Sequence, residues 1–351
     1  MRHALTLAGW ALGRVAPNPA VGCVIVSRER RVVGRGWTKP GGRPHAEAVA
    51  LAQAGKAARG SAAYITLEPC AHHGQTPPCA QALVAAGVAR VVAAVEDPDP
   101  RVQGKGFAML RDAGIEVTTG VLQNEAANLN AGFFLRIEQD RPLVTLKIAQ
   151  SRDGKTISPP GANKWITGEE ARRFAHLLRA QHDAILVGIG TVLADDPMLD
   201  CRLPGLEDRS PLRIVLDTHL RLPAHLKLVR TARRIPTMVF TASEGGDRLR
   251  ELGAEVPRVM RDVQGKPALG AVLGVLAQRG LTRLLVEGGA TVISQFLKER
   301  LADRLELFTA PVALGNAATG DIAGLTNPAE LALRCTRMFG GDKLESYALR
   351  A

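Results

Sequence analysis

One stretch, residues 44–80, restricts the possible folds more than any other part of the chain. It reads PHAEAVALAQAGKAARGSAAYITLEPCAHHGQTPPCA, with His45, Glu47 two positions later, and Cys70 and Cys79 each directly after a proline. One imidazole and two thiolates are three ligands for a tetrahedral Zn²⁺, and a site with three protein ligands leaves its fourth position open for water. The stretch therefore predicts a catalytic zinc site with ligands His45, Cys70 and Cys79.

The order of these residues is also informative. His-x-Glu followed by Pro-Cys and a second Cys is typical of zinc deaminases, in which a Glu that does not bind the metal carries protons. Zinc lowers the pKa of its bound water to about 7, and Glu47 would carry the proton to the leaving amine. We expect His45 and Glu47 in the first turn of a helix, Cys70 at the end of a strand over residues 62–69, and Cys79 at the start of the next helix.

Two other interpretations of the stretch remain open at this point. A structural zinc would need a fourth protein ligand, which His72 or His73 could provide. A disulfide between Cys70 and Cys79 is the other, but five cysteines in 351 residues are an odd number. With no signal peptide at the N-terminus, they indicate a reducing compartment, and we expect a cytoplasmic protein.

Length and the order of the expected elements predict two α/β domains. At 351 residues the chain is too long for one typical core. Strands alternate with helices in both halves, which favours a three-layer first domain with a mainly parallel sheet over residues 1–140 and a second α/β domain over residues 141–351. In the second domain we expect Thr167 to cap a helix, the segment TVLADDPMLDCR to be a loop, and KLESYALR to be the last strand.

The charge of the chain leaves the class of partner open. The formal net charge is +11, but Lys and Arg are scattered and only 4% of residues are aromatic, so nucleic acid is not favoured as a partner. A phosphorylated substrate and a phosphate-rich cofactor explain the excess equally well. No apolar run approaches the roughly 18 residues of a membrane span.

The second half carries a weaker signal for a cofactor. VEGGA predicts a strand that enters a helix through two glycines, where free backbone N–H groups could hold a phosphate. A tight turn between a strand and a helix explains the same residues. No G-x-G-x-x-G fingerprint is present, which disfavours a Rossmann dehydrogenase.

Several motifs, in this order along the chain, resemble one family. They are APNPAVGCVIV, HAEAVAL, TLEPCAHHGQTPPC, ARVVAAVEDPDP, KWIT, LLRAQHDAILVGIGTVLADDP and VEGGATV. Together they resemble the bifunctional deaminase-reductase of riboflavin biosynthesis over nearly the whole chain. The resemblance implies a cytidine-deaminase-like domain that removes an amino group from 2,5-diamino-6-(phosphoribosylamino)pyrimidinone with Zn²⁺. It also implies a dihydrofolate-reductase-like domain that uses NADPH to reduce the ribosyl chain to ribityl.

The resemblance also assigns site residues, position by position. His45, Cys70 and Cys79 match the zinc ligands, and Glu47 matches the proton-transfer residue. The positions that match contacts to NADP are Ala149, Trp165, Thr191, Asp195, Thr218, Gly289, Ala290, Thr291, Val292, Ile293, Ser294 and Gln295. The positions that match contacts to substrate are Asn18, Asn163, Arg179, Leu199, Arg202 and Glu287. Gln75 departs from the family, which usually has Lys or Arg there.

Two rival functions predict different observations. A nucleic-acid or nucleoside deaminase with an appended basic domain would bind RNA in a salt-sensitive way, but eight residues separate Cys70 from Cys79, in place of the two in that signature. A non-catalytic zinc module would close its metal with four protein ligands. We expect a small-molecule substrate, no nucleic acid or membrane as a partner, and a homo-oligomer, dimer or tetramer.

Overall fold

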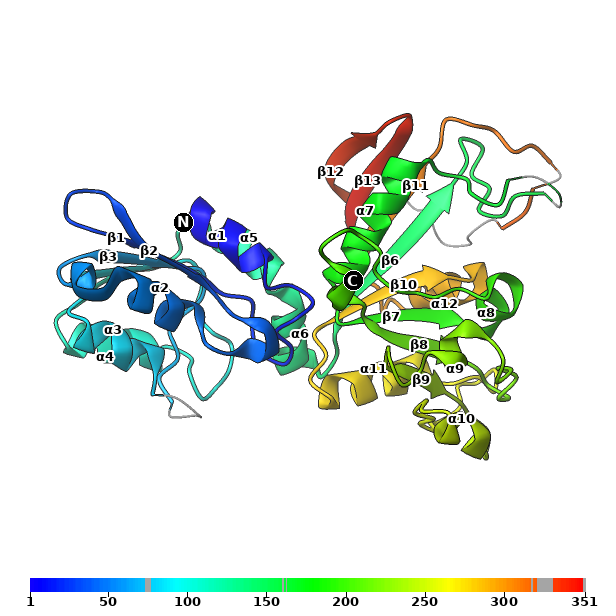
Figure 1. Ribbon diagram of the computed structural model, residues 1–351, viewed down its shortest axis with the longest axis horizontal. Coiled ribbons are helices and arrows are strands. Elements are labelled where there is room, and N and C mark those ends of the chain that lie inside the picture. The colour runs from blue at the N-terminus through cyan, green and yellow to red at the C-terminus, as the bar shows by residue number, and fades with distance from the viewer. Residues whose placement is uncertain (73–76, 160, 162, 317, 321–330, 350–351) are drawn as a thin grey trace. The chain divides into compact units, whose positions relative to one another are not determined.

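The chain forms two compact units, Met1–Arg141 and Pro142–Ala351, drawn in Figure 1. The computed structural model describes residues 1–72, 77–159, 161, 163–316, 318–320 and 331–349. In that part of the chain, no helix combines the length and the apolar character needed to cross a bilayer.

The first unit is built on one mixed sheet whose strand order is β2-β1-β3-β4-β5. Its strands are β1 (Gly22–Val26), β2 (Val32–Trp37), β3 (Ala62–Ile65), β4 (Arg90–Ala93) and β5 (Glu116–Thr118). Its helices are α1 (Arg2–Gly9), α2 (Ala46–Ala54), α3 (Cys79–Ala85), α4 (Lys105–Asp112), α5 (Gln123–Leu129) and α6 (Ala131–Gln139), with 3₁₀ turns at Pro40–Gly42 and Gly55–Ala58.

Strand β1 makes this sheet less parallel than the sequence predicts. It runs antiparallel to both of its neighbours, β2 and β3, whereas β3, β4 and β5 are parallel. The hairpin from β1 to β2 reverses the chain, and α2 then returns it across β1 to β3. Two of the four strand pairings are therefore parallel.

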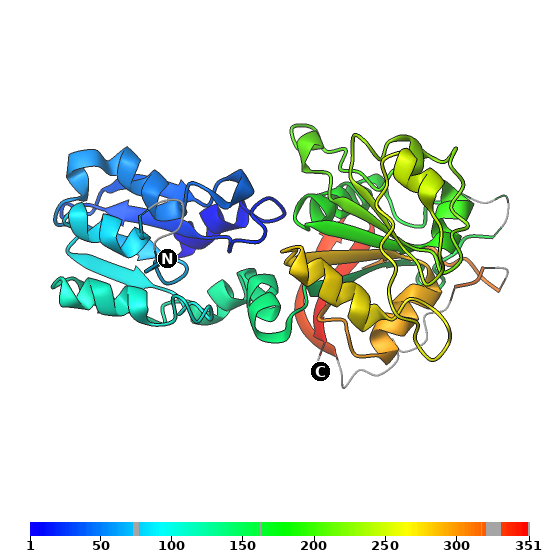
Figure 2. The same ribbon diagram turned by 90° about the horizontal axis from the view of Figure 1, so that it is seen from below.

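The two faces of β1 are buried under different helices. Cys23 and Ile25 belong to the core cluster that contains residues of α2 and α3, while Val24 packs with Leu7 of α1. This alternation is that of a strand buried on both faces, and it makes the unit three layers deep. Figure 2 shows the first unit from a second direction.

Helix α2 lies unusually close to β2, and this contact fixes the start of the helix. A Cβ atom at Gly36 would stand 2.0 Å from the carbonyl oxygen of Ala46. Only glycine allows such an approach. Because Ala46 is the first residue of α2, the contact also fixes the position of His45.

The second unit contains one sheet with the order β12-β13-β11-β6-β10-β7-β8-β9. Strands β6 to β11 all run parallel, and β12 and β13 add an antiparallel hairpin at one edge. The strands are β6 (Leu143–Gln150), β7 (Ala184–Gly188), β8 (Leu212–Leu216), β9 (Thr237–Phe240), β10 (Arg283–Gly288), β11 (Arg304–Thr309), β12 (Leu331–Phe339) and β13 (Asp342–Leu349). The helices are α7 (Glu169–Ala180), α8 (Ile189–Asp195), α9 (Lys227–Arg230), α10 (Asp247–Glu251), α11 (Leu269–Gln278) and α12 (Ala290–Lys298), with a 3₁₀ turn at Glu207–Arg209.

Helices cover both faces of this sheet and diverge at the carboxyl ends of two neighbouring strands. Helices α11 and α12 pack on one face, and α7, α8 and α9 pack on the other. Strands β7 and β10 are neighbours, yet the helices that follow them, α8 and α12, leave to opposite faces. Such a point, at the carboxyl ends of parallel strands, is where α/β sheets bind ligands.

Two local expectations for the second unit are wrong, and one strand was not predicted. Helix α7 begins one residue later than predicted, with Gly168 as its N-cap, because Asp342 accepts the Gly168 N–H at 2.6 Å. The segment predicted as a loop begins inside α8, a helix that ends at Asp195. Strand β12 was not expected, since only the strand after it shows a clear pattern.

Candidate metal and cofactor sites

Two helix starts and the segment after β3 bring the predicted metal ligands together. His45 is the N-cap of α2 and Cys79 is the first residue of α3, while Cys70 is the fifth residue after the end of β3, in a segment that begins with a bend. The imidazole Nδ1 of His45 lies 3.7 Å from the Cys70 sulfur and 3.3 Å from the Cys79 sulfur. A tetrahedral zinc with ordinary Zn–S and Zn–N bonds separates sulfur from nitrogen by about 3.6 Å. The three donors therefore fit zinc.

The two thiols of the cluster differ in charge state. Contact with the Cys79 side chain, together with His45 and despite burial, lowers the pKa of the Cys70 thiol to about 4, whereas contact with the Cys70 side chain, and next burial, raise the pKa of the Cys79 thiol. The backbone N–H of Cys79 donates to the Cys70 sulfur at 3.3 Å, as expected at a helix N-terminus. Cys70 is therefore a thiolate at neutral pH.

Glu47 lies in the first turn of α2 and is 3% exposed. Burial, and next the charge of Cys70, raise the pKa of its carboxyl to about 7. A carboxyl group with such a pKa can both accept and donate a proton near neutral pH.

Among the described residues, no fourth His, Cys, Asp or Glu joins this cluster. The three donor atoms lie within 4.8 Å of one another, and His72 is not part of the group. His73 and Gln75 lie outside the described residues. Cys70 and Cys79 are free cysteines, so the cluster is not a disulfide.

Glu68 anchors the segment that carries Cys70, a role that no local pattern of residues indicates. Its carboxylate is 3% exposed and accepts backbone N–H groups from Gly104 and Gly106 at 2.9 Å and from Asp97 and Phe107 at 3.3 Å. These donors include the unpaired N–H groups at the start of α4. Glu68 thereby joins the metal segment to a separate helix.

Asn18 lies beside the loop that leads to His45. Its side chain occupies the space where a Cβ on Gly42 would stand. Gly42 is three residues before His45, so the Asn18 side chain lies near the start of α2. This location is compatible with a contact between Asn18 and a substrate held at the metal.

In the second unit, Gly288, Gly289 and Thr191 form a cradle of glycine and threonine at the carboxyl ends of β7 and β10. Gly288 ends β10, and Gly289 is the N-cap of α12 with a φ of 74°. A Cβ atom at Gly288 would stand 3.1 Å from the hydroxyl oxygen of Thr191, in the first turn of α8. Glycine backbone beside the start of a helix leaves N–H groups accessible, and such groups commonly bind phosphate. This cradle fits the diphosphate of a dinucleotide.

A buried ion pair lies at the same sheet edge. Arg179 of α7 donates from Nε and Nη2 to the two carboxylate oxygens of Glu287 on β10, both at 2.8 Å. Burial would raise the pKa of Glu287, but Arg179 and then Lys147 more than offset it, so the pKa is lowered. Glu287 is therefore ionised at neutral pH, which favours orientation of Arg179 over proton donation.

The remaining predicted residues are found mostly at the carboxyl ends of the same strands. Ala149 is near the end of β6, and Thr218 follows β8, where its carbonyl accepts hydroxyl protons from Thr241 and Ser243. Leu199 is 4% exposed with a φ of 51°. Asp195 ends α8 with an exposed side chain.

Three other predicted residues are engaged in local contacts. The Asn163 side chain accepts the Trp165 N–H at 3.0 Å, and Trp165 is 51% exposed, with a guanidinium of Arg172 5.2 Å from its ring. Gln295, the last residue of the predicted stretch and part of α12, donates to Asp262 and Glu299. Its side chain is thus already occupied.

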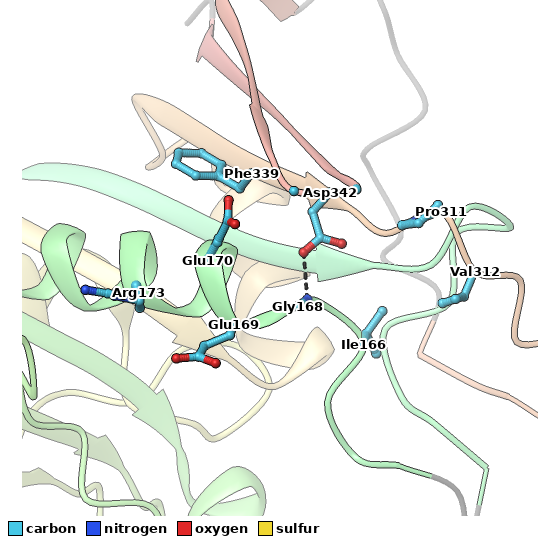
Figure 3. Close-up of a pocket in the computed structure, with 11 residues that line it drawn as sticks. Ile166, Gly168, Glu169, Glu170, Arg173, Pro311, Val312, Phe339 and Asp342 are labelled. Atoms are coloured by element: carbon cyan, nitrogen blue, oxygen red, sulfur yellow. Dashed lines mark hydrogen bonds between the residues drawn. The ribbon is translucent and has the colours of Figure 1, made fainter.

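A cavity of about 550 Å³ lies near the start of α7 (Figure 3). None of the predicted site residues lines it. Its walls include Glu169, Glu170, Arg173, Phe339 and Asp342, and Figure 3 shows Asp342 bonded to the Gly168 N–H. This cavity is therefore separate from the residues that the sequence assigns to either reaction.

Comparison with known proteins decides between the candidate families. Residues 1–95 match the model of the cytidine and deoxycytidylate deaminase zinc-binding region, and residues 142–342 match the RibD C-terminal domain. The riboflavin biosynthesis protein RibD of Aquifex aeolicus is 43% identical over 92% of this chain and 89% of its own length. The chain belongs to the RibD family.

Other members of the RibD family agree over their whole length. The Escherichia coli protein is 40% identical over 91% of this chain and 89% of its own. The structure of Acinetobacter baumannii RibD, form 1, has a TM-score of 0.88 at 38% identity and covers 100% of this chain and 98% of that chain. The deaminase/reductase of Thermotoga maritima has a TM-score of 0.87 at 34% identity, with 99% and 97% covered.

Membership of the RibD family confirms several expectations. The chain is a bifunctional enzyme of riboflavin biosynthesis, with a zinc-binding deaminase domain and a reductase domain of the type that uses NADPH. It acts on small molecules. The fold class, α/β with a cytidine-deaminase-like domain before a reductase domain, is also confirmed. A nucleic-acid deaminase with an unrelated basic domain is thereby set aside.

Sequence reasoning missed two titratable residues that lie near Arg179 and Glu287, besides Glu68 in the deaminase unit. Lys147 lies within β6 next to Glu287, and its signal was a single charge inside the apolar strand LVTLKIAQ. His176 lies one helical turn before Arg179 on α7, a spacing that places both on one face.

Proposed function

We propose that residues 1–140 carry the deaminase activity and residues 141–351 the reductase activity. The deaminase would act on 2,5-diamino-6-(phosphoribosylamino)pyrimidinone, the substrate that the family resemblance implies. His45, Cys70 and Cys79 would hold the zinc. A zinc ion in such a site supplies the Lewis acidity that makes water a nucleophile near neutral pH.

Glu47 is the residue that we propose to move protons in the deaminase. It takes a proton from the attacking water and delivers it to the amine nitrogen of the ring. The C–N bond then breaks and ammonia leaves, so water supplies the oxygen of the product carbonyl. Burial of Glu47 two residues after His45 supports this role, because a shielded carboxylate beside the reacting atoms exchanges protons with them in preference to solvent.

For the reductase we propose two groups of residues at the carboxyl ends of the parallel strands. The cofactor would be held by Ala149, Trp165, Thr191, Asp195, Thr218 and residues 289–295. The substrate would be held by Asn163, Arg179, Leu199, Arg202 and Glu287, with the two guanidinium groups as ligands for the phosphate. NADPH supplies the hydride that reduces the ribosyl carbon to ribityl.

The observation that carries the deaminase assignment is the convergence of three soft donors beside the buried Glu47. The test replaces Glu47 by Gln in the full chain and measures zinc content, ammonia release and NADPH oxidation. We expect zinc to stay bound, ammonia release to fall at least about a hundredfold, and reduction of the deaminated substrate to continue. Full ammonia release by this variant would refute the role of Glu47.

We also propose that the enzyme works as a cytoplasmic homo-oligomer, a dimer or tetramer. Five free cysteines support a reducing compartment. Sedimentation equilibrium of the zinc-loaded chain over a range of concentrations tests the assembly. A single species with the mass of one chain at micromolar concentration would rule it out.

A further inference from the structure

The ring of His176 joins α7 to the segment that follows α8, at a place to which no role has been assigned. Its Nδ1 lies 3.1 Å from the carbonyl oxygen of Asp200, and its Nε2 lies 3.3 Å from Nη2 of Arg202. The same carbonyl oxygen accepts a hydrogen bond from Nη1 of Arg179 at 3.0 Å. The ring therefore stands between the two arginines proposed to bind the substrate phosphate.

The partners of His176 determine its tautomer. A carbonyl oxygen can only accept, so Nδ1 must carry the proton that it donates to Asp200, and a guanidinium can only donate, so Nε2 must hold a lone pair for Arg202. The opposite tautomer could accept only the backbone N–H of Arg202, 3.3 Å from Nδ1. It would then direct Nε2–H against another donor. The neutral ring with its proton on Nδ1 satisfies more of its neighbours.

The side chain of Arg202 is held by fewer contacts than that of Arg179, so a hydrogen bond to His176 matters more for its position. Arg179 is held by its bidentate pair with Glu287 and its side chain is 14% exposed. The Arg202 side chain is 57% exposed, and its nearest carboxylate oxygen, on Asp200, is 3.7 Å away, too far for a hydrogen bond. A long exposed arginine loses several rotatable bonds of freedom when it binds an anion.

We propose that His176 is a positioning residue of the reductase: through Nε2 it holds the Arg202 guanidinium beside Arg179, so that both face one phosphate of the substrate. This rests on the proposed function, in which the two arginines bind that phosphate. The neutral ring directs Arg202, whereas a protonated ring has donors on both nitrogens and releases it.

The surroundings of the ring keep it neutral. Burial, and next the positive charges of Arg179 and Arg202, lower the pKa of His176 below its usual value. The titratable and charged groups that face the ring are Arg179 of α7, Asp200 and Arg202 of the segment after α8, and Glu287 of β10. On this proposal a substrate phosphate between the two arginines binds more tightly while Nε2 remains an acceptor, so acid weakens binding.

Two substitutions distinguish the hydrogen bond made by Nε2 from the one made by Nδ1. In His176→Gln the side-chain oxygen reaches about as far as Nε2 and can still accept from Arg202. In His176→Asn the side chain reaches only as far as Nδ1, so the bond to Asp200 can survive while Arg202 is released. Steady-state reduction is measured in the full zinc-loaded chain with the deaminated phosphoribosylaminopyrimidine and NADPH.

We expect His176→Asn to raise KM for the pyrimidine about tenfold, the scale of one lost hydrogen bond to a charged group. Its kcat and its KM for NADPH should stay within about twofold, and His176→Gln should keep KM for the pyrimidine within about threefold. In the Arg202→Ala background, His176→Asn should add nothing. Below pH 6, KM should rise more steeply for the unchanged chain than for His176→Gln, which shares the titration of the phosphate but lacks the imidazole.

The proposal is overturned if His176→Asn leaves KM for the pyrimidine unchanged, if its effect adds in full to that of Arg202→Ala, or if KM for NADPH rises in parallel. A separate failure, in which Arg202→Ala itself does not change KM, would contradict the proposed substrate contacts instead. The tautomer is tested without substrate by ¹⁵N NMR of the chain labelled at its eight histidines, with His176→Gln identifying the signal. A proton on Nε2 at pH 7.5 would refute the positioning role whatever the kinetics show.

Discussion

Replacing Glu68 by Gln should destabilise the deaminase unit although the residue touches no substrate. Each carboxylate oxygen accepts two backbone N–H groups: Oε1 those of Gly106 and Phe107, and Oε2 those of Asp97 and Gly104. In glutamine one of these oxygens becomes an NH₂ group, which faces two donors. Two buried N–H groups lose their acceptor at about 1–2 kcal/mol each, and α4 loses a negative charge at its N-terminus. We expect the free energy of unfolding to fall by about 3 kcal/mol.

The assay isolates the first unit within the full chain. Trp10 and Trp37 lie in the first unit, and Trp165, the third tryptophan of the chain, lies in the second. In a Trp165→Phe background, fluorescence during urea denaturation reports the first unit alone. Free zinc is held constant, because a metal that binds only the folded unit stabilises it by mass action.

A surface carboxylate provides the matched control. Glu116 pairs with Arg90 at 3.1 Å, with its side chain 66% exposed, and Glu116→Gln should change the stability by less than about 1 kcal/mol. If Glu68→Gln and Glu116→Gln have equal, small effects, the four backbone donors do not depend on the carboxylate, and the account of how Cys70 is anchored is wrong.

The remaining predictions concern the two cofactors and the buried ion pair. Removing zinc with a chelator should abolish ammonia release and leave NADPH oxidation on the deaminated substrate within about twofold; parallel loss of both activities would contradict separate sites. Gly289→Ala, at a φ of 74°, should raise KM for NADPH about tenfold, whereas Gly270→Ala, where a Cβ meets nothing within 4 Å, should not. Arg179→Lys should lower reductase kcat/KM at least about tenfold because Lys cannot form the bidentate pair with Glu287; ammonia release measures any indirect damage and should be unchanged.

The metal cluster could be predicted from the sequence because its residues depend on local structure. His45 and Cys79 stand at helix starts that the chain marks itself, by an apolar run after His45 and by Pro78 before Cys79. A residue type and a helix boundary were enough to place both. Glu68 was missed because its partners lie near 97 and 104–107, at distances along the chain that no local pattern encodes.

The reductase site shows the opposite case. Arg179 and Glu287 are 108 residues apart, and only the strand order, with β10 inserted between β6 and β7, brings them together. Helix α7 begins at Gly168, not at Thr167, for the same kind of reason, since its partner Asp342 is 174 residues away. Such contacts follow from topology, and the family resemblance could name these residues without explaining their proximity.

The net charge of +11 left the class of partner open, because a count of charges does not say which of them lie on the surface. Arg213 is 0% exposed and donates to three carbonyl oxygens and two hydroxyl groups. Burial lowers its pKa, but only to about 10, so the guanidinium stays charged inside the protein. One of its acceptors is the carbonyl of Met198, the residue before Leu199. Arg213 is therefore one basic residue whose charge does not reach the surface. It holds the segment that carries Arg202, where we expect a phosphate as the ligand.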